Sequence, residues 1–434
     1  MKKATKIDDM LVNFYPEPLR EDELQEFYCE DTMELRTGDP NFSPIDNIFY
    51  ECQIPQEHNA FLLMGHRGCG KSTELNRMAV ILREQGYMVE TVACGKDLDL
   101  VDMESSDLLI LLGETLVRMA NEIGYSPNNE LIKKLKRFWG NAEHEETVEN
   151  IASIEAESSI SASTPALLQL IKLFAGVKTQ LKTDKQTKKI YRDKIINRTS
   201  DWLKIINELS DGITEKLVGK QPILIFEDLD KLDPEMAWKV FLYNASVLSS
   251  LPMPVIYTFP IALSYDTRFP ALSNYFKDEF LPMIKIETPE GGVYKKGINS
   301  ICRLVEKRAG QNLFVPEALE KMILLTGGSL RDLFKVIIDA AARARNRKSE
   351  QISAEDAERA LMRLETDLTR RIEQKDYSFL AAIYSGQKKL ISDKLHLLTM
   401  MQASVVLEYN GERWHNVHPL VSRFLNRHNQ LKDI

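Results

Sequence analysis

Residues 61–75 read FLLMGHRGCGKSTEL, an apolar run followed by three glycines and then by lysine, serine and threonine. From Gly65 to Ser72 the spacing is GxxxxGK[ST]. Glycines suit this stretch because the backbone has to curl until several amide N–H groups point into one phosphate-sized hollow. Lys71 is then placed to neutralise the outer phosphates, and the Ser72 hydroxyl to ligate Mg²⁺. The stretch therefore predicts a nucleotide-binding loop.

The residues on either side of the loop fit this prediction. AFLLM before it predicts a short buried strand, and STELNRMAVILREQ after it predicts an amphipathic helix. The positive N-terminal end of that helix adds to the attraction for phosphate. We expect the nucleotide to be bound by Gly65, Gly68, Cys69, Gly70, Lys71, Ser72 and Thr73. The side chains at the free positions, His66, Arg67 and Cys69, are expected to point outward.

Length and composition set the broad class of protein. The 434 residues leave room for roughly two or three domains with a substantial core. No apolar run approaches the length of a membrane span, and MKKATKIDDM lacks the apolar core of a signal peptide. The five cysteines are scattered without CxxC pairing. We therefore expect a cytoplasmic protein without a membrane partner, structural zinc or disulfide framework.

The net charge of −8 is unevenly distributed. Residues 301–434 carry 22 Lys and Arg against 17 Asp and Glu, or +5, which leaves −13 for residues 1–300. An acidic N-terminal part followed by a mildly basic C-terminal part neither excludes nor indicates nucleic acid as a partner.

The periodicity of apolar residues and the positions of loop-forming residues divide the chain into four segments. We expect an N-terminal lead-in over 1–58, an α/β core over 59–290, a helical lid over 291–370 and a winged-helix domain over 371–434. In the core, GYMVETVACG predicts a second strand, and helices are expected over 105–124, 129–139 and 191–219. From about 140 to 190 the residues are small and polar and then lysine-rich. This segment predicts an insertion that is mobile or folds against a partner.

QPILIFEDLDKLDPEMAW, residues 221–238, is the second informative stretch. ILIF predicts a buried parallel strand, which places Glu227 and Asp228 at its carboxyl end. Open α/β sheets bind ligands at that edge. One acid there can hold Mg²⁺, and its neighbour can orient or deprotonate an attacking water. Asp230 and Asp233 extend the acidic patch.

Three further polar residues are candidates for contact with nucleotide. Thr258, near the end of the predicted strand PMPVIYTFPIAL, could reach the γ-phosphate or the attacking water, or could only cap the strand. Arg268 could stay at the surface, or project into a neighbouring subunit's nucleotide site as an arginine finger. Arg331 follows a glycine pair in TGGSLRD and opens a helix, so it is positioned to reach back to a phosphate.

This order of motifs resembles the AAA+ ATPases, in particular the branch of origin-recognition initiators and transposition-regulator ATPases. It is also similar to the signal-transducing STAND ATPases, and the resemblance covers roughly residues 40–430. It implies a P-loop NTPase core with a parallel sheet flanked by helices, and ATP and Mg²⁺ as cofactors. It also implies Walker A roles for Lys71 and Ser72.

The resemblance also implies roles for the other candidates. Glu227 would be the metal-side acid of Walker B, Asp228 the water-activating acid, Thr258 sensor 1 and Arg331 sensor 2. The two acids stand in the order Glu-Asp where the family has Asp-Glu. The shorter Asp228 carboxylate would sit farther from the water, so we expect ATP binding with slow hydrolysis.

The C-terminal residues predict helices followed by a hairpin. DYSFLAAIYSG and KKLISDKLHLLTMM predict the helices, and SVVLEYNGERWHNV predicts two strands joined at Asn410-Gly411. This order favours a winged-helix domain. The closing VHPLVSRFL resembles the end of the STAND winged helix, which implies contact between His418 and a bound diphosphate. Pro419 replaces the acid of that motif.

We therefore expect an ATP- and ADP-binding switch that passes its state to a protein partner or to a second copy of the chain. An alternative is an ATP-dependent assembly ATPase that binds DNA through the winged helix and the basic run Arg343 to Lys348. A P-loop small-molecule kinase is a minor alternative, for which the sequence shows no acceptor-site signature.

Overall fold

The computed structural model describes residues 1–39, 41–54, 56, 59–140, 170–172, 174–177, 179, 185–386, 388, 391–409 and 413–431. Most of the expected insertion and the Asn410-Gly411 turn lie outside these residues.

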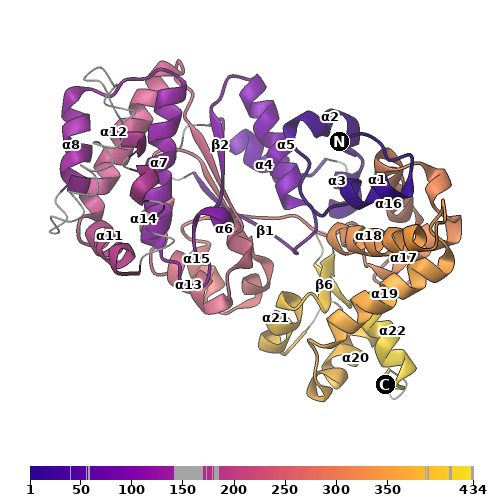
Figure 1. The fold of residues 1–434 in the computed structure, drawn as a ribbon. Coiled ribbons are helices and arrows are strands. Elements are labelled where there is room, and N and C mark those ends of the chain that lie inside the picture. The colour runs from indigo at the N-terminus through magenta and orange to yellow at the C-terminus, as the bar shows by residue number, and fades with distance from the viewer. Residues whose placement is uncertain are drawn as a thin grey trace.

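A parallel sheet forms the centre of the core (Figure 1). In the described residues it has five strands in the order β2-β3-β4-β1-β5, and each neighbouring pair is parallel. The strands are β1 (Ala60–Gly65), β2 (Val89–Ala93), β3 (Ile223–Glu227), β4 (Val255–Pro260) and β5 (Lys277–Phe280). Every residue of β1 and β4 is buried, as expected for parallel strands covered on both faces. The strands predicted from the sequence, which correspond to β1, β2, β3 and β4, are confirmed, whereas β5 was not predicted.

Alternate residues of β1 face opposite layers of helices. Phe61 and Leu63 pack in the same apolar cluster as residues of α4 (Pro44–Glu51) and α5 (Lys71–Glu84). Leu62 and Met64 belong to the cluster on the other face, where α7 (Ser105–Glu122) and α12 (Thr199–Lys216) lie (Figure 1). The other helices of the core are α6 (Cys94–Asp97), α8 (Asn129–Gly140), α11 (Lys185–Asn197), α13 (Pro234–Phe241), α14 (Ala245–Ser249) and α15 (Phe269–Leu272). A five-stranded parallel sheet in these described residues, flanked by helices and with a glycine-rich loop after β1, is the P-loop NTPase fold.

The single helix expected over 191–219 is two helices, α11 and α12. At the junction Arg198 has non-helical backbone angles, φ −131° and ψ 32°. The Thr199 hydroxyl donates a hydrogen bond to the Ile195 carbonyl at 2.8 Å, a local bond of the kind that competes with the helical ladder. Periodicity continues through this break, so the sequence pattern did not reveal it.

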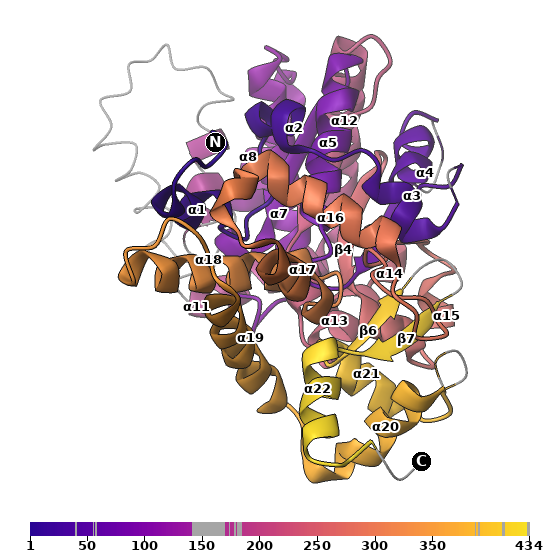
Figure 2. The ribbon, with the colours of Figure 1, turned by 90° about the vertical axis from the view of Figure 1, so that its right-hand side faces the viewer.

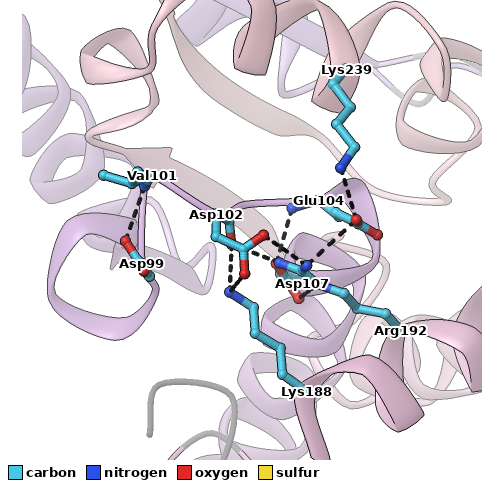
Figure 3. A network of polar contacts seen from close by, with 8 residues as sticks. All are labelled: Asp99, Val101, Asp102, Glu104, Asp107, Lys188, Arg192 and Lys239. Atoms are coloured by element: carbon cyan, nitrogen blue, oxygen red, sulfur yellow. Dashed lines mark hydrogen bonds and ion pairs between the residues drawn. The ribbon is translucent and has the colours of Figure 1, made fainter. Parts of the chain in front are cut away.

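A cluster of ion pairs fixes α11 to the start of α7 (Figure 3). Arg192 Nε and Nη2 donate to the fully buried Asp107 carboxylate at 3.0 and 2.5 Å. Lys188 lies 3.2 Å from Asp102, and Lys239 pairs with Glu104 at 2.9 Å. Lys188, at the end of the lysine-rich run, is thus engaged within the fold.

The predicted lead-in is an integral part of the folded body, and its first three helices lie beside those of the lid (Figure 1). Besides α4 it contains α1 (Ile7–Asn13), α2 (Glu21–Phe27) and α3 (Thr32–Thr37). Phe14, after α1, packs edge-on against Phe334 of the lid, with ring centroids 5.4 Å apart. The Leu19 amide donates to the Thr73 hydroxyl of α5 at 3.3 Å. The segment therefore bridges the lid and the helix that follows the phosphate loop.

The C-terminal third consists of the predicted lid and the domain beyond it (Figure 2). The segment expected to form a lid, called the lid below, contains α16 (Lys295–Arg308), α17 (Pro316–Leu325), α18 (Leu330–Asn346) and α19 (Ala354–Thr369). They are followed by α20 (Tyr377–Ser385), α21 (Lys394–Gln402), β6 (Val406–Tyr409), β7 (Trp414–Val417) and α22 (Pro419–Arg427). The predicted helices and the antiparallel strand pair are confirmed. In the part of the chain described here, no helix combines the length and apolar character needed to cross a membrane.

The C-terminal strands are buried rather than extended into solvent. Every residue of β6 and β7 is buried. The Tyr409 hydroxyl donates to the Gly327 carbonyl of the lid at 2.8 Å, and Met283 of the core forms a bridge with Tyr409. The hairpin is thus packed between the core and the lid.

Candidate nucleotide-binding site

A cavity of about 480 Å³ lies at the carboxyl edge of the sheet, where β1, β3 and β4 end. This volume is typical of small-molecule sites. The predicted residues that line it are Gly68, Gly70, Lys71, Ser72, Thr73, Glu227, Asp228, Thr258 and Arg331. The cavity therefore unites the phosphate loop, the acidic strand end and the start of the lid helix α18. Of the predicted site residues, Gly65, Cys69, Arg268 and His418 do not line it.

The phosphate loop holds Lys71 in a buried position. Gly68 and Gly70 have positive φ angles of 86° and 108°, which glycine adopts without strain. Lys71 Nζ donates to the Gly65 and His66 carbonyls at 2.7 and 3.1 Å. The loop is therefore curled around its own lysine.

Asp230 completes the surroundings of Lys71. The Asp230 Oδ2 to Lys71 Nζ distance is 2.9 Å. Burial opposes the charged form of each partner, but their mutual attraction prevails, so the pKa of Lys71 is raised and that of Asp230 is lowered. The sequence analysis assigned Asp230 only to an acidic patch and did not predict its pairing with Lys71. Its position two residues after Asp228 was the one feature of the sequence that could have indicated this role. A phosphate that binds Lys71 has to compete with this carboxylate.

Glu227 and Ser72 form a pair of oxygen donors that fits Mg²⁺. Glu227 Oε1 is buried, with no hydrogen-bond partner among the described residues. Burial raises the pKa of Glu227, the Ser72 hydroxyl opposes this by hydrogen bonding, and the neighbouring Asp228 raises the pKa further. A cation would satisfy the orphaned oxygen and reverse the cost of charging a buried acid. A carboxylate, a hydroxyl and phosphate oxygens are ligands that Mg²⁺ accepts.

The Asp228 carboxylate is held by neighbours outside the phosphate loop. The Asp228 backbone has a positive φ of 72°, and the carboxylate forms an ion pair with Lys231. A Cβ built on Gly95 would lie 2.9 Å from Asp228 Oδ2, so the carboxylate lies against α6. In this arrangement Lys231 neutralises the acid that was expected to activate water.

Thr258, on β4, is hydrogen-bonded to the end of the neighbouring strand β3. Its hydroxyl accepts from the Leu229 amide at 3.1 Å and donates to the Phe226 carbonyl at 3.4 Å. The hydroxyl therefore fixes the turn after β3. Because Thr258 also lines the cavity, its expected role toward the γ-phosphate remains a prediction.

The lid helix α18 rests directly on the phosphate loop. The Arg331 amide donates to the Gly68 carbonyl at 3.4 Å, and a Cβ built on Gly68 would lie 2.4 Å from Cβ of Arg331. The Ser329 hydroxyl caps the helix by accepting from the Asp332 amide. Within the described residues the Arg331 guanidinium has no hydrogen-bond or ion-pair partner, although Arg331 lines the cavity.

The expectation that His66 and Cys69 point outward is wrong. Cys69 is fully buried and His66 is 2% exposed. His66 Nε2 accepts a hydrogen bond from the Glu408 amide of β6 at 2.8 Å. Burial lowers the pKa of His66 to about 3, so the ring is a neutral acceptor. The hairpin that covers the loop is more than 300 residues away in the chain, which is why local reasoning missed this contact.

Arg268 and His418 lie apart from the cavity. Arg268 pairs with Asp266 at 2.8 Å and lies over the Trp238 ring, 4.7 Å from its centroid. His418 is fully buried, and its Nδ1 caps α22 by accepting from the Leu420 amide at 3.2 Å. His418 Nε2 lies 4.0 Å from Asp332, the residue after Arg331. Their roles toward a neighbouring subunit and a bound diphosphate remain predictions.

The basic run from Arg343 to Lys348 is partly neutralised by acidic neighbours. Arg343 pairs with Asp339 at 3.1 Å, and Arg347 pairs with Asp356. Arg345 lies 3.9 Å from Asp8. These contacts weaken the run as a site for DNA phosphates.

Part of the lining of the cavity comes from residues that the sequence analysis did not single out. It includes Tyr28 and Arg36 of the N-terminal segment and Arg308 and Phe334 of the lid. Arg308 stacks over Phe334 at 4.5 Å and donates to the Asn13 carbonyl at 2.9 Å. Sequence reasoning missed these residues because only the fold brings the two segments together.

No protein-family model and no curated protein matches this sequence. Several solved structures are similar along nearly the whole chain. Cdc6p from Pyrobaculum aerophilum has 11% identity and a TM-score of 0.40, and the alignment covers 99% of each chain. The ORC2 protein of Aeropyrum pernix, in ADPNP-ADP complexes, has 12% identity and a TM-score of 0.39, covering 96% of this chain and 95% of that one. The Walker-type ATPase paby2304 of Pyrococcus abyssi has 14% identity and a TM-score of 0.43, covering 95% and 99%.

Cdc6, ORC and Walker-type ATPase structures are the kind of protein to which the motif order predicted a resemblance, and that resemblance is confirmed to this extent. Identities and TM-scores this low assign no function. The case for a nucleotide site rests on the residues of this chain.

Proposed function

We propose that the chain binds Mg-ATP in this cavity and acts as a slowly hydrolysing switch that passes its nucleotide state to a protein partner or to a second copy of itself. One observation carries the proposal. One cavity unites the loop residues Lys71 and Ser72, the acid Glu227 and the lid residue Arg331, whose guanidinium has no partner among the described residues.

Each of these residues has a task in binding. The amides at the start of α5 bind phosphate oxygens, and Lys71 exchanges Asp230 for the outer phosphates. Ser72 and Glu227 hold Mg²⁺, which when bound screens the phosphate charges and polarises the γ-phosphate. Arg331 binds the γ-phosphate and thereby holds the lid against the loop.

The contact of Arg331 with the γ-phosphate can shift the equilibrium between the two states of the switch, but its free energy is too small to drive the full change alone. A hydrogen bond to a charged group contributes about 1.5–3 kcal/mol. Moving a two-state equilibrium from mostly off to mostly on takes about 5.5 kcal/mol of differential affinity. Contacts of Lys71 with the same phosphate would have to provide much of the remainder.

Hydrolysis is slow in this proposal because Asp228 is engaged elsewhere. Asp228 lines the cavity, but its carboxylate has to leave Lys231 and its position against α6 before it can orient water. A partner that binds Lys231 or shifts the turn after β3 would release it.

The phosphate loop is in direct contact with two segments that could pass the nucleotide state to a partner. The Gly68 to Arg331 contact connects the loop to the lid, and the His66 to Glu408 hydrogen bond connects it to the C-terminal hairpin. Binding of phosphate therefore changes the surroundings of both neighbours.

Hydrogen exchange and phosphate release test the proposal together. We expect Mg-ATP to change the exchange rate of the β6–β7 amides and of the first turn of α18 more than ADP does. Phosphate release should be slow and should be lost in Asp228→Asn. If ATP binds and leaves both segments unchanged, the switch is refuted. If duplex DNA speeds phosphate release and binds less tightly as salt rises, the DNA-binding alternative replaces the protein partner.

A further inference from the structure

A buried arginine from the N-terminal segment lies against the helix end that is expected to bind phosphate. Arg36, in α3, is 2% exposed and lines the cavity. A Cβ built on Gly70, the residue that precedes α5, would lie 3.2 Å from Arg36 Nη2. The guanidinium therefore stands at the start of α5, beside the amides that bind α- and β-phosphates in loops of this kind.

The guanidinium is poorly satisfied where it lies. Nη1 donates to the Pro282 carbonyl at 2.8 Å. Nε is buried and has no hydrogen-bond partner in the described part of the chain. No acid of the described residues lies within the 4.0 Å ion-pair distance of Arg36. A buried cation with unused donors is costly unless a ligand pairs with it.

A purely structural role for Arg36 would be to balance the negative charge of the buried Glu74 carboxylate. Burial raises the pKa of Glu74, and the charge of Arg36 lowers it. The Glu74 carboxylate, however, already accepts a hydrogen bond from the Tyr28 hydroxyl at 2.8 Å. No hydrogen bond or ion pair joins Arg36 to Glu74 in the described residues, so the Arg36 donors other than Nη1 are available to another partner.

We propose that Arg36 is a nucleotide-binding residue that donates hydrogen bonds to an α- or β-phosphate oxygen. The assignment rests on the proposed function, since it requires a nucleotide on the loop. It makes the N-terminal segment a third contributor to the site, beside the core and the lid. Nucleotide binding would then tie these three parts together.

The test compares Arg36→Met and Arg36→Lys with the wild-type chain and with Arg303→Met. Arg303 is a matched control because it also lies where α16 meets the N-terminal segment, but its side chain is 55% exposed and pairs with Asp31. Calorimetry would measure the Kd for Mg-ATP and Mg-ADP, and thermal unfolding would measure Tm without nucleotide.

We expect Arg36→Met to weaken binding of both nucleotides by about 10- to 100-fold, because a bond to a charged group is lost. Arg36→Lys should fall between Arg36→Met and the wild type, since it keeps the charge and loses the planar fork. Tm without nucleotide should be unchanged or higher in Arg36→Met, and Arg303→Met should bind like the wild type.

A structural role predicts the opposite pattern, in which Tm falls and Kd stays the same, and that result would overturn the assignment. If Arg36→Met does not fold, an unchanged Kd for Arg36→Lys overturns it as well. Failure of the wild type to bind either nucleotide would refute the proposed function itself, whereas tight binding by both Arg36 variants refutes only the role of Arg36.

Discussion

Gly68→Ala tests whether the lid senses the nucleotide through the phosphate loop. The substitution has two separate costs. Gly68 has a φ of +86°, where an alanine costs about 1–2 kcal/mol. The new Cβ would also lie 2.4 Å from Cβ of Arg331, whereas carbon atoms in contact are about 3.5–4.0 Å apart. The lid helix must retreat by about 1 Å or more, and such overpacking costs about 1–3 kcal/mol.

Gly219→Ala separates the two costs. Gly219 has a φ of +88°, and a Cβ built there meets nothing within 4 Å, so this control has only the backbone strain. Urea unfolding should show a loss of about 1–2 kcal/mol for Gly219→Ala and about 2–5 kcal/mol for Gly68→Ala. Calorimetry should show wild-type ATP affinity in Gly219→Ala and an affinity about 10- to 100-fold weaker in Gly68→Ala.

A double variant identifies the route of the effect. If Gly68→Ala acts by displacing Arg331, then adding Gly68→Ala to Arg331→Met should weaken ATP binding little further. Equal stability and equal affinity of Gly68→Ala and Gly219→Ala would refute the contact between loop and lid. Full additivity of Gly68→Ala and Arg331→Met would show that alanine disturbs the loop itself.

Three further predictions concern the buried polar contacts. Asp107→Asn leaves Arg192 without its buried acid, so urea unfolding should show that the free energy of unfolding falls by about 3–5 kcal/mol. A fall of less than about 1 kcal/mol would contradict this. Burial lowers the pKa of His418 to about 4, so its contribution to stability is complete above about pH 6.5 and is lost as the pH falls toward 4. The wild type should therefore lose up to about 3 kcal/mol more than His418→Gln over that range, and parallel pH profiles would contradict the account. His66→Ala leaves the Glu408 amide unbonded, and hydrogen exchange of β6 should quicken while the exchange of β2 stays the same.

Local sequence patterns predicted the sheet and the centre of the site. The strand before Gly65, the ILIF strand and the turn at Arg331 each carry their signal within a few neighbouring residues. Phosphate binding imposes glycine, lysine and hydroxyl residues at fixed spacing, so this part of the cavity is visible without a fold. The same holds for the buried strands, whose apolar runs follow from coverage on both faces.

The remainder of the site depends on contacts between distant segments. The partner of His66 is the Glu408 amide, and a backbone group gives no signal in the sequence. Arg36 reaches Gly70 only because α3 packs beside the loop, and the lead-in has no motif that indicates this. The ion pair of Asp228 with Lys231 lies within four residues, but the positive φ that directs the carboxylate is a property of the folded turn.

The central claim is that this cavity binds Mg-ATP. Calorimetry of the full chain with Mg-ATP tests it most directly, beside Ser72→Ala and the double variant Lys71→Met with Asp230→Asn. The double variant is used because Lys71→Met alone would leave the Asp230 carboxylate buried without its partner. The account predicts one bound ATP per chain, with affinity reduced in Ser72→Ala and lost in the double variant while both stay folded. Absence of ATP binding by the wild type, or equal binding by all three proteins, would contradict it.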